Sequence, residues 1–250
     1  AVAVARHIDG GAAIVLPRAN EHFESLARLV RGLEAELGCR AQTNAYLSPA
    51  GASAFLPHHD AHDVIAVQTY GSKTWTIYDN QDGVRPTRTF DARRDQPGPK
   101  RESFTTRQGD CCYLPQGVVH DAVSDDLSLH VTVGIHWVRV SEVLTTLIKQ
   151  AIDKRPELHS VLPVNWWQAG ADRDGAVAQV GAAAEFLQDG DAILDCFSFL
   201  RQDLVDTRQP LVPGQLEQLA RIDELSANTV LAVRDPVLLD LLDDEEGPVL

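Results

Sequence analysis

The stretch from Ser128 to Trp137 alternates strictly between two kinds of side chain, which is the pattern of a β-strand with two different faces. The apolar face consists of Leu129, Val131, Val133, Ile135 and Trp137, and the other face of Ser128, His130, Thr132, Gly134 and His136. The second face fits a solvent-exposed surface and fits equally a strand that lines a polar pocket. The sequence leaves both readings open.

Other short apolar runs, each bounded by turn residues, indicate that this strand belongs to a mostly β domain. The predicted strands cover residues 12–16, 64–68, 73–78 and 111–114, with a further one in the segment 42–48. Gly71-Ser72 and Gln108-Gly109-Asp110 are the tight turns between them. Many small strands with such turns are the usual material of a jelly roll.

Helical periodicity appears on both sides of the strands. The predicted helices cover residues 20–37, 143–152, 171–188, 191–205 and 213–225, and the chain ends in short strands around an acidic turn. We therefore expect a β-rich domain over residues 1–140, a helical domain over 141–206 and a small α+β segment over 207–250. The loop over 79–102 is rich in basic residues and is either a substrate-contacting insertion or a plain solvated loop.

The charge and the cysteine content limit the function classes. A net charge of −14 argues against direct nucleic-acid binding, which depends on neutralising phosphates, and suits either a basic protein partner or solubility alone. The four cysteines have no metal-binding spacing and are expected to be buried, reduced thiols of a cytoplasmic protein. No apolar run is long enough to span a bilayer. No signal peptide is visible, but the sequence starts at Ala1 without methionine, so residues can be missing upstream.

A His-x-Asp pair, His58 and Asp60, stands in the run PHHDAHD. Side chains two apart on a strand share a face, so this pair could offer an imidazole and a carboxylate to one metal ion. His120, which follows a Pro-Gln-Gly turn, is the candidate third ligand. Two histidines and one carboxylate with open positions are the ligand set of non-haem Fe(II) oxygenases. His59, His62 and Asp63 crowd the pair, and a ligand swap among them is open.

Lys73 lies just after the predicted Gly71-Ser72 turn, so its ammonium group can project into the same cavity. A lysine beside a metal ion is unfavourable unless an anion lies between them. A dicarboxylate that chelates the metal with one end and pairs with Lys73 at the other satisfies both charges. This reasoning points to 2-oxoglutarate as the cosubstrate.

The run 44–78, the segment GDCCYLPQGVVHDA and the strand SLHVTVGIHW resemble the JmjC-type ribosomal oxygenases of the cupin superfamily. The resemblance implies a double-stranded β-helix, a helical dimerisation region that contains VLPVNWW, and a winged-helix-like C-terminal segment that is short for a full winged helix. It also implies that Fe(II) is held by His58, Asp60 and His120, and that Lys73 binds 2-oxoglutarate. Asn44 and Thr132 would line the cosubstrate pocket, and Tyr46 and His130 would contact the substrate.

The activity implied by this resemblance is O2-dependent hydroxylation of a protein side chain, with a basic ribosomal protein as the substrate and a homodimer as the assembly. One alternative keeps the chemistry and takes a small molecule or a peptide natural product. A second alternative is a cupin that binds ligands without catalysis. The resemblance does not separate hydroxylation from demethylation.

Overall fold

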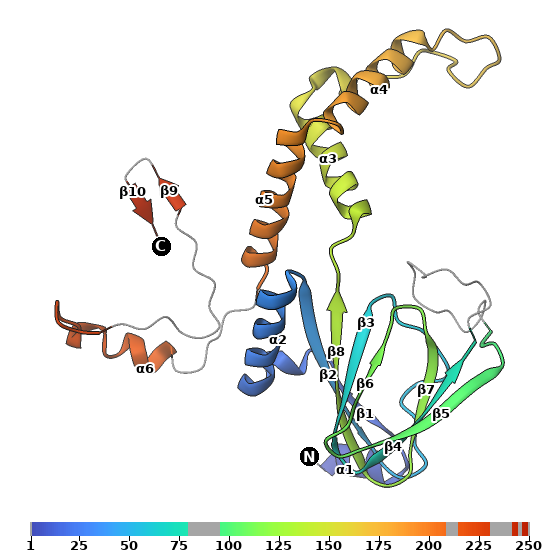
Figure 1. Cartoon of the computed structure of the whole chain (residues 1–250), viewed down its shortest axis with the longest axis vertical. Coiled ribbons are helices and arrows are strands. Elements are labelled where there is room, and N and C mark those ends of the chain that lie inside the picture. The colour runs from blue at the N-terminus through green and yellow to red at the C-terminus, as the bar shows by residue number, and fades with distance from the viewer. Residues whose placement is uncertain (1, 80–95, 209–214, 231–241, 245–246, 250) are drawn as a thin grey trace. The chain divides into compact units, whose positions relative to one another are not determined.

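The computed structural model describes residues 2–79, 96–208, 215–230, 242–244 and 247–249 (Figure 1). Most of the basic loop, residues 80–95, lies outside the described part. The chain divides into two compact units, residues 1–137 with 209–250 and residues 138–208. The division reflects which residues contact one another most densely. The three functional domains expected from the sequence stay a prediction.

The first unit contains a five-stranded antiparallel sheet with the order β1-β2-β8-β3-β6. Its strands are β1 (Ile14–Leu16), β2 (Arg40–Ser48), β3 (Asp63–Tyr70), β6 (Cys111–Leu114) and β8 (Ser128–His136). The strand predicted from the alternation at 128–137 is β8, the central strand of this sheet, between β2 and β3. Its register with β2 places His130 opposite Tyr46 and Thr132 opposite Asn44. Four candidate site residues therefore lie on two neighbouring strands.

A three-stranded antiparallel sheet has the order β5-β4-β7, with β4 (Ser72–Tyr78) in the centre, β5 (Lys100–Arg107) on one side and β7 (Val119–Ser124) on the other. The predicted turn between β3 and β4 is present and depends on Gly71, whose φ is +66°. A Cβ at this position would lie 2.2 Å from the carbonyl oxygen of Leu127, so no side chain fits there. The turn delivers Lys73 to the second position of β4.

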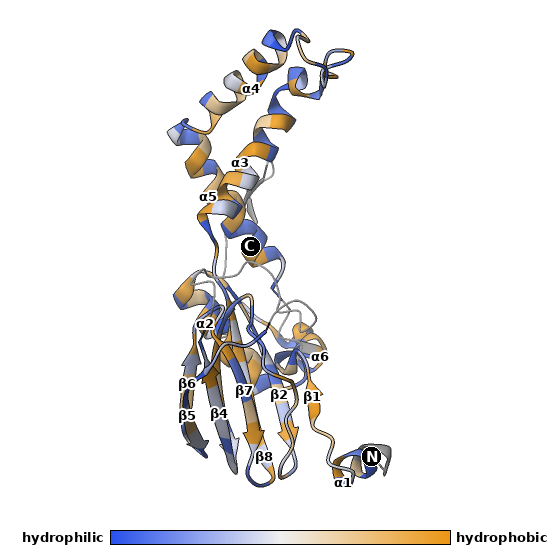
Figure 2. Cartoon of the chain, turned by 90° about the vertical axis from the view of Figure 1, so that its right-hand side faces the viewer, coloured by the Kyte–Doolittle hydropathy of each residue, from blue (hydrophilic) through white to orange (hydrophobic). Residues whose placement is uncertain are grey.

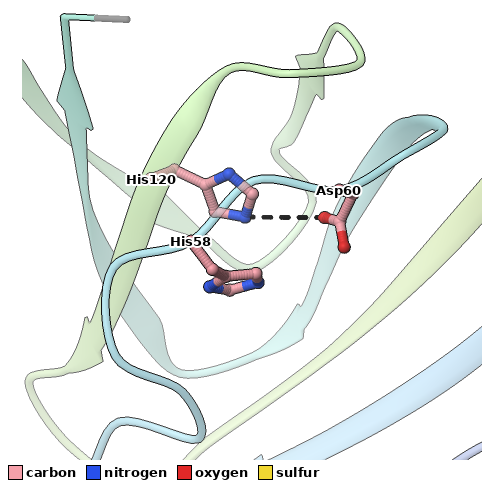
Figure 3. Close-up of side chains that lie close together, drawn as sticks. All are labelled: His58, Asp60 and His120. Carbon is pink, nitrogen blue, oxygen red and sulfur yellow. Dashed lines mark ion pairs between the residues drawn. The ribbon is translucent and has the colours of Figure 1, made fainter. Parts of the chain in front are cut away.

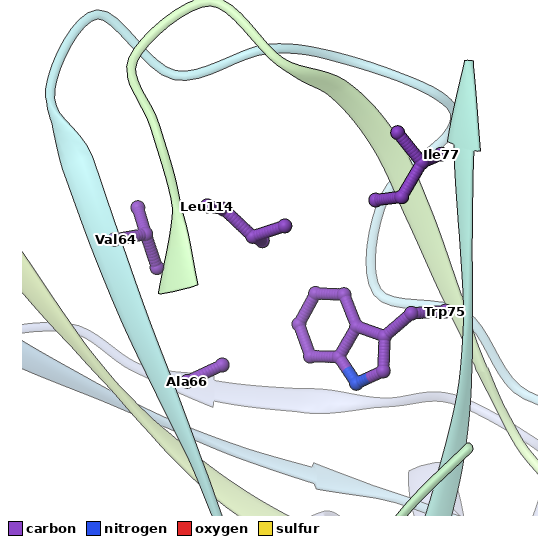
Figure 4. Packing of buried hydrophobic residues seen from close by; sticks show 5 residues of the cluster. All are labelled: Val64, Ala66, Trp75, Ile77 and Leu114. Atoms are coloured by element: carbon purple, nitrogen blue, oxygen red, sulfur yellow. The ribbon is translucent and has the colours of Figure 1, made fainter. Parts of the chain in front are cut away.

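The core lies between the two sheets. Val64 and Ala66 of β3 and Leu114 of β6 face Trp75 and Ile77 of β4, and each is at most 5% exposed (Figure 4). Because apolar area removed from water stabilises by about 25 cal/mol per Å², this cluster holds the sheets together at one end and leaves the polar inner positions to line a cavity.

The outer face of the five-stranded sheet is covered by the helix α2 (Glu24–Leu37), which ends at Gly38 as predicted. Val133 and Ile135 of β8 pack there with Cys39 and with Leu33 of the helix. This part of the apolar face of β8 is thus buried under α2. On the polar face His136 is exposed, whereas His130 and Thr132 line a cavity, so the pocket reading of the sequence holds for these two residues.

The second unit consists mainly of α3 (Val140–Lys154), α4 (Asp174–Phe186) and α5 (Gly190–Asp206). Leu147 of α3 and Ala192 and Cys196 of α5 form its small core. Hydrophobic residues recur along these helices (Figure 2), and Val140 and Leu194 are among those that are exposed. The sequence expectation of a mostly β region followed by a helical region is confirmed in this coarse form.

Several local expectations were wrong. The helix α1 (Val2–Asp9) was not predicted. Between the 3-10 helix at Pro156–His159 and α4, residues 161–163 have no regular structure and residues 164–167 form turns, where a helical segment was expected. The helix predicted over 213–225 is, in its described part, the short α6 (Gln215–Leu219) and a 3-10 turn at Ile222–Glu224. The chain ends in the hairpin β9 (Leu242–Asp244) and β10 (Gly247–Val249), and the winged-helix expectation is not confirmed.

The cysteines follow the expectation only in part. Cys39 and Cys196 are buried and reduced, whereas Cys111 on the edge strand β6 is exposed. Adjacent residues on a strand face opposite ways, so one of the pair Cys111 and Cys112 had to point outward. Among the described residues, no helix is long and apolar enough to cross a membrane.

Candidate functional site

The side chains of His58, Asp60 and His120 lie close together (Figure 3). Their nearest candidate ligand atoms all lie within 4.8 Å of one another. Nε2 of His120 is 3.8 Å from Oδ2 of Asp60, and the two imidazole centroids are 4.7 Å apart. The structure therefore brings together the three residues that the sequence analysis selected, while their role as metal ligands stays a prediction.

The local structure that positions them differs from the expectation. His58 and Asp60 were expected to share one face of a strand, but β3 begins only at Asp63. Instead, the loop is held against β7 by a two-residue bridge in which the backbone N–H groups of His58 and His120 donate to each other's carbonyl oxygens at 3.0 and 2.8 Å. The N–H of Gly117 also donates to the carbonyl of Asp60 at 3.1 Å. The His-x-Asp pair meets His120 because these bonds attach the loop to β7.

Backbone carbonyls select the nitrogen that each histidine can offer. Nδ1 of His58 is 2.9 Å from the oxygen of Leu56, and Nδ1 of His120 is 2.9 Å from the oxygen of Val118. A carbonyl oxygen accepts only, so Nδ1 carries the proton and Nε2 keeps its lone pair. Burial, followed by the proximity of His58, lowers the pKa of His120 and keeps its imidazole neutral. Two imidazoles whose Nδ1 atoms face backbone carbonyls, together with one carboxylate, form a donor set that fits Fe(II) with positions left open.

The neighbouring residues that crowded the motif have other positions. His62 stacks on His136 with centroids 4.5 Å apart, and it lies so close to Gly134 that a Cβ there would meet its Nε2 at 2.7 Å. His59 is buried, 7% exposed. Within the described part of the chain, the group of three that could hold a metal ion is His58, Asp60 and His120, without His59, His62 or Asp63.

Asp63 is instead a buried acceptor that connects three segments. Its carboxylate accepts hydrogen bonds of 2.6 Å from the hydroxyl of Tyr113, the backbone N–H of Gln116 and the indole N–H of Trp137. These donors come from β6, from the turn that leads to His120, and from the end of β8. Asp63 therefore supports the site indirectly, by holding together the segments that position His120.

We expect Asp63→Asn to lower the free energy of unfolding by about 3 kcal/mol, because an amide offers one acceptor oxygen where three donors need two. Chemical denaturation at neutral pH measures this loss. Affinity for a divalent metal should stay within about threefold of wild type, since hydrogen bonds and not ligation are removed. A large loss of metal affinity in a folded Asp63→Asn protein would place Asp63 among the ligands.

A cavity of about 600 Å³ opens beside the three residues. Its lining includes every site residue expected from the sequence, namely Asn44, Tyr46, His58, Asp60, Lys73, His120, His130 and Thr132. It also includes His62, which was named as an alternative ligand, and residues that sequence reasoning did not select, among them Phe55 and Trp75. Phe55 contacts His58 edge-on with centroids 5.3 Å apart. The sequence signal that could have identified Phe55 is its position three residues before His58.

Lys73 is 1% exposed, which is unusual for a lysine. Its ammonium group is 3.2 Å from Oγ of Ser48 and 3.5 Å from Nδ1 of His130, and in the described part of the chain no carboxylate lies within ion-pair distance of it. Burial lowers the pKa of Lys73 to about 8. A buried cation with polar but uncharged neighbours is costly in the free protein, and an anionic ligand in the cavity would remove that cost.

The wall next to Lys73 is aromatic and polar. Tyr46 stacks on His130 with centroids 4.6 Å apart and an interplanar angle of 7°. Oδ1 of Asn44 accepts a hydrogen bond of 3.0 Å from the backbone N–H of Arg18, which orients the amide. Burial raises the pKa of Tyr46 in spite of its hydrogen bonds with Thr132 and Asn44, so the phenol stays protonated. This wall presents fixed hydrogen-bonding groups to a polar ligand.

Comparison with known proteins gives consistent results. The JmjC domain family matches residues 18–143, just over half of the chain. The chain is 31% identical over 173 residues to the bifunctional lysine-specific demethylase and histidyl-hydroxylase NO66 of Dictyostelium discoideum. The match covers 65% of this chain and 34% of the relative. The Caenorhabditis elegans protein of the same name is 28% identical over 180 residues, covering 67% of this chain and 24% of the relative. The chain thus spans about a quarter to a third of the length of these relatives.

Two solved structures of Escherichia coli YcfD have a similar fold. One is YcfD itself, with a TM-score of 0.57 and 15% identity over 80% of this chain and 54% of that chain. The other is described as the ribosomal oxygenase YcfD in complex with cobalt and 2-oxoglutarate, with a TM-score of 0.55 and 16% identity over 85% of this chain and 58% of that chain. At this identity the likeness concerns the fold.

Proposed function

The chain belongs to the JmjC domain family, and on that premise we propose that it is an Fe(II)- and 2-oxoglutarate-dependent oxygenase that hydroxylates a side chain of a ribosomal protein. The family assignment confirms the resemblance drawn from the sequence. The observation that carries the proposal is that His58, Asp60 and His120 share one cavity with the buried ammonium group of Lys73. Three metal ligands alone would fit many functions. The buried ammonium group of Lys73 beside them calls for an anionic ligand in the same cavity.

In this proposal Nε2 of His58, Nε2 of His120 and the carboxylate of Asp60 hold Fe(II). The bound iron supplies the redox chemistry by which O2 and 2-oxoglutarate are converted to a hydroxylated substrate, succinate and CO2. Lys73 pairs with the carboxylate of 2-oxoglutarate that is far from the metal. Asn44 and Thr132 line the cosubstrate side of the cavity, and the apolar rings of Tyr46, Phe55 and Trp75 limit the access of water.

A protein substrate is supported by three observations. The curated relatives are named as histidyl-hydroxylases and demethylases, and a structural neighbour is named as a ribosomal oxygenase. The net charge of −14 favours a basic partner such as a ribosomal protein. The loop at the mouth of the cavity exposes Phe55 by 50% and Leu56 by 76%, and such apolar groups suit contact with a polypeptide.

We also propose a homodimer formed through the helical unit. Four apolar side chains of the helical unit are between 44% and 76% exposed, namely Leu194 and Phe197 of α5 and Val140 and Leu144 of α3. Exposed apolar surface of this kind suits contact with a second copy of the chain. Size-exclusion chromatography with light scattering tests the assembly. A monomer at micromolar concentration would contradict it.

The function is tested by incubating the Fe(II)-loaded protein with 2-oxoglutarate, O2 and ribosomal proteins. We expect a mass gain of one oxygen atom on one protein side chain, in step with succinate release. A gain seen only on a small molecule or a short peptide would support the alternative substrate class. Loss of a methyl group would indicate demethylation, and the absence of turnover with every substrate would support a binding module without catalysis.

Binding of 2-oxoglutarate is expected to weaken as the pH rises through about 8. The pKa of Lys73 is lowered by burial, so the free protein carries the ammonium below about 8 and loses it above. Calorimetric titration of the Mn(II)-loaded protein between about pH 6.5 and 9.5 measures this alkaline limb. Lys73→Arg should abolish the limb, because a guanidinium does not titrate in this range. A limb that persists unchanged in Lys73→Arg would assign it to another group.

A further inference from the structure

We propose that His130 is a positioning residue, which accepts at Nδ1 from the ammonium group of Lys73 and thereby directs the remaining N–H of that group into the cavity. This arrangement gives the site its preference for a 2-oxo acid with a second, distal carboxylate. The inference rests on the proposed function and assigns His130 a role in cosubstrate selection, whereas the sequence analysis expected a contact with the substrate.

The ammonium group of Lys73 has three N–H donors and no acceptor. One donor is directed to Oγ of Ser48 at 3.2 Å and a second to Nδ1 of His130 at 3.5 Å. Ser48 is fully buried and does not line the cavity, so it holds the ammonium from behind. His130 lines the cavity wall at its side. With two of the three directions assigned, the third N–H is available to a carboxylate in the cavity.

The imidazole of His130 is held in the orientation that this role requires. It stacks on Tyr46 at 4.6 Å, and Trp75 meets it edge-on with centroids 5.6 Å apart at 79°. The backbone fixes the same contact, because His130 and Tyr46 are register partners of β8 and β2. Two aromatic neighbours and one strand pairing therefore leave the ring little freedom to rotate away from Lys73.

The charge state of His130 suits an acceptor. Burial, and then the charge of Lys73, lower its pKa to about 3, so the ring is neutral near pH 7. A neutral imidazole has one bare nitrogen, and the ammonium next to Nδ1 selects that nitrogen as the bare one. At 3.5 Å the contact is long for a hydrogen bond. Its contribution is therefore mainly to the direction of the ammonium.

A purely structural role for His130 makes a different prediction. If the ring only fills space between Tyr46 and Trp75, phenylalanine at this position should do the same and leave ligand binding unchanged. Ser128 offers a matched control on the same strand and face. It is also fully buried, and its hydroxyl accepts a hydrogen bond of 2.8 Å from Nε2 of Gln68 in place of a contact with Lys73.

The experiment compares His130→Phe, His130→Asn, His130→Gln and Ser128→Ala in the full chain loaded with Mn(II). Calorimetry measures the affinity for 2-oxoglutarate and for 2-oxopentanoate, which has the same chain length and no distal carboxylate. We expect His130→Phe to weaken 2-oxoglutarate binding about tenfold and to leave 2-oxopentanoate unchanged. His130→Asn should retain wild-type affinity within about threefold, because its side-chain oxygen lies near the place of Nδ1.

His130→Gln places its polar group near the position of Nε2, so it should behave as His130→Phe does. This pair of amide variants keeps the test decisive if the phenylalanine variant fails to fold. Ser128→Ala should lower the melting temperature and bind both acids as wild type does. The proposal is overturned if all His130 variants bind 2-oxoglutarate equally, or if both acids lose affinity to the same extent.

A double-mutant cycle separates positioning from direct contact. If His130 acts through Lys73, His130→Phe should have no further effect on 2-oxoglutarate binding in a Lys73→Met background. Additive losses would mean that His130 touches the ligand itself, which overturns this assignment. Wild-type protein that fails to bind 2-oxoglutarate would instead refute the proposed function, so the two failures are distinguishable.

Discussion

Asp60→Ala is expected to reduce the affinity for Mn(II) or Fe(II) by more than about 100-fold and to lower turnover by more than about 1,000-fold. The carboxylate is the one anionic member of the ligand set, so its loss removes both a donor atom and the charge that offsets the metal's. Asp60 is a loop residue whose side chain is about one-third exposed, and the variant should fold as wild type does. Calorimetry with Mn(II) and succinate release measure the two losses.

Two control variants make this result specific. Asp121 is the neighbour of His120 on β7, and its carboxylate accepts a hydrogen bond of 2.6 Å from the hydroxyl of Tyr78. Asp121→Ala removes the same charge close to the site and should retain metal affinity. His62→Ala should retain it as well, although His62 lines the cavity. Retained affinity in Asp60→Ala together with loss in His62→Ala would show that the ligand set is wrong.

Lys73→Met is expected to have two opposite effects. Binding of 2-oxoglutarate should weaken by about 100-fold or more, because a buried charge-assisted pair is lost. The ligand-free protein should become more stable, since methionine fills a similar volume without a buried charge. Activity and stability thus place opposite demands on this position.

The stability gain follows from the pKa of Lys73, which burial lowers from 10.5 to about 8. A lowered lysine pKa means that the fold disfavours the charged form, so the penalty is fully present below the folded-state value and vanishes above the unfolded-state value. At 1.36 kcal/mol per pH unit, the ceiling of the gain at neutral pH is about 3 kcal/mol. Urea denaturation of the ligand-free proteins near pH 7 and near pH 10.5 should show a gain at the lower pH and little at the higher.

Lys100 provides the control for this substitution, because it is an exposed lysine at the start of β5. Lys100→Met should change neither the stability nor the binding of 2-oxoglutarate appreciably. If Lys73→Met destabilises the ligand-free protein by several kcal/mol, Lys73 has a structural partner and its burial is not evidence for an anion site.

The elements of the fold that could be predicted from the sequence are those whose signal is local. The alternation from Ser128 to His136 identified β8, the Gly71 turn identified the β3–β4 hairpin, and the helical periodicity identified α2, α3 and α5. The chemistry of a candidate site could be predicted in the same way, because imidazole, carboxylate and ammonium groups are read directly from residue types. His58, Asp60, His120 and Lys73 were selected on that basis.

The sequence by itself thus determined several of the strands and the reactive groups of this protein, because periodicity and residue chemistry depend on near neighbours in the chain. It did not predict β5, whose first residues were expected to be loop, or β7. Only the tertiary structure decided that the polar face of β8 lines a cavity, since α2 from a distant segment covers the other face. It also decided that Asp60 faces His120 while Asp63 ties strands together, although the two carboxylates are three residues apart. The physical reason is that burial and hydrogen-bond partners come from segments that are distant in the chain, and local pattern carries no information about them.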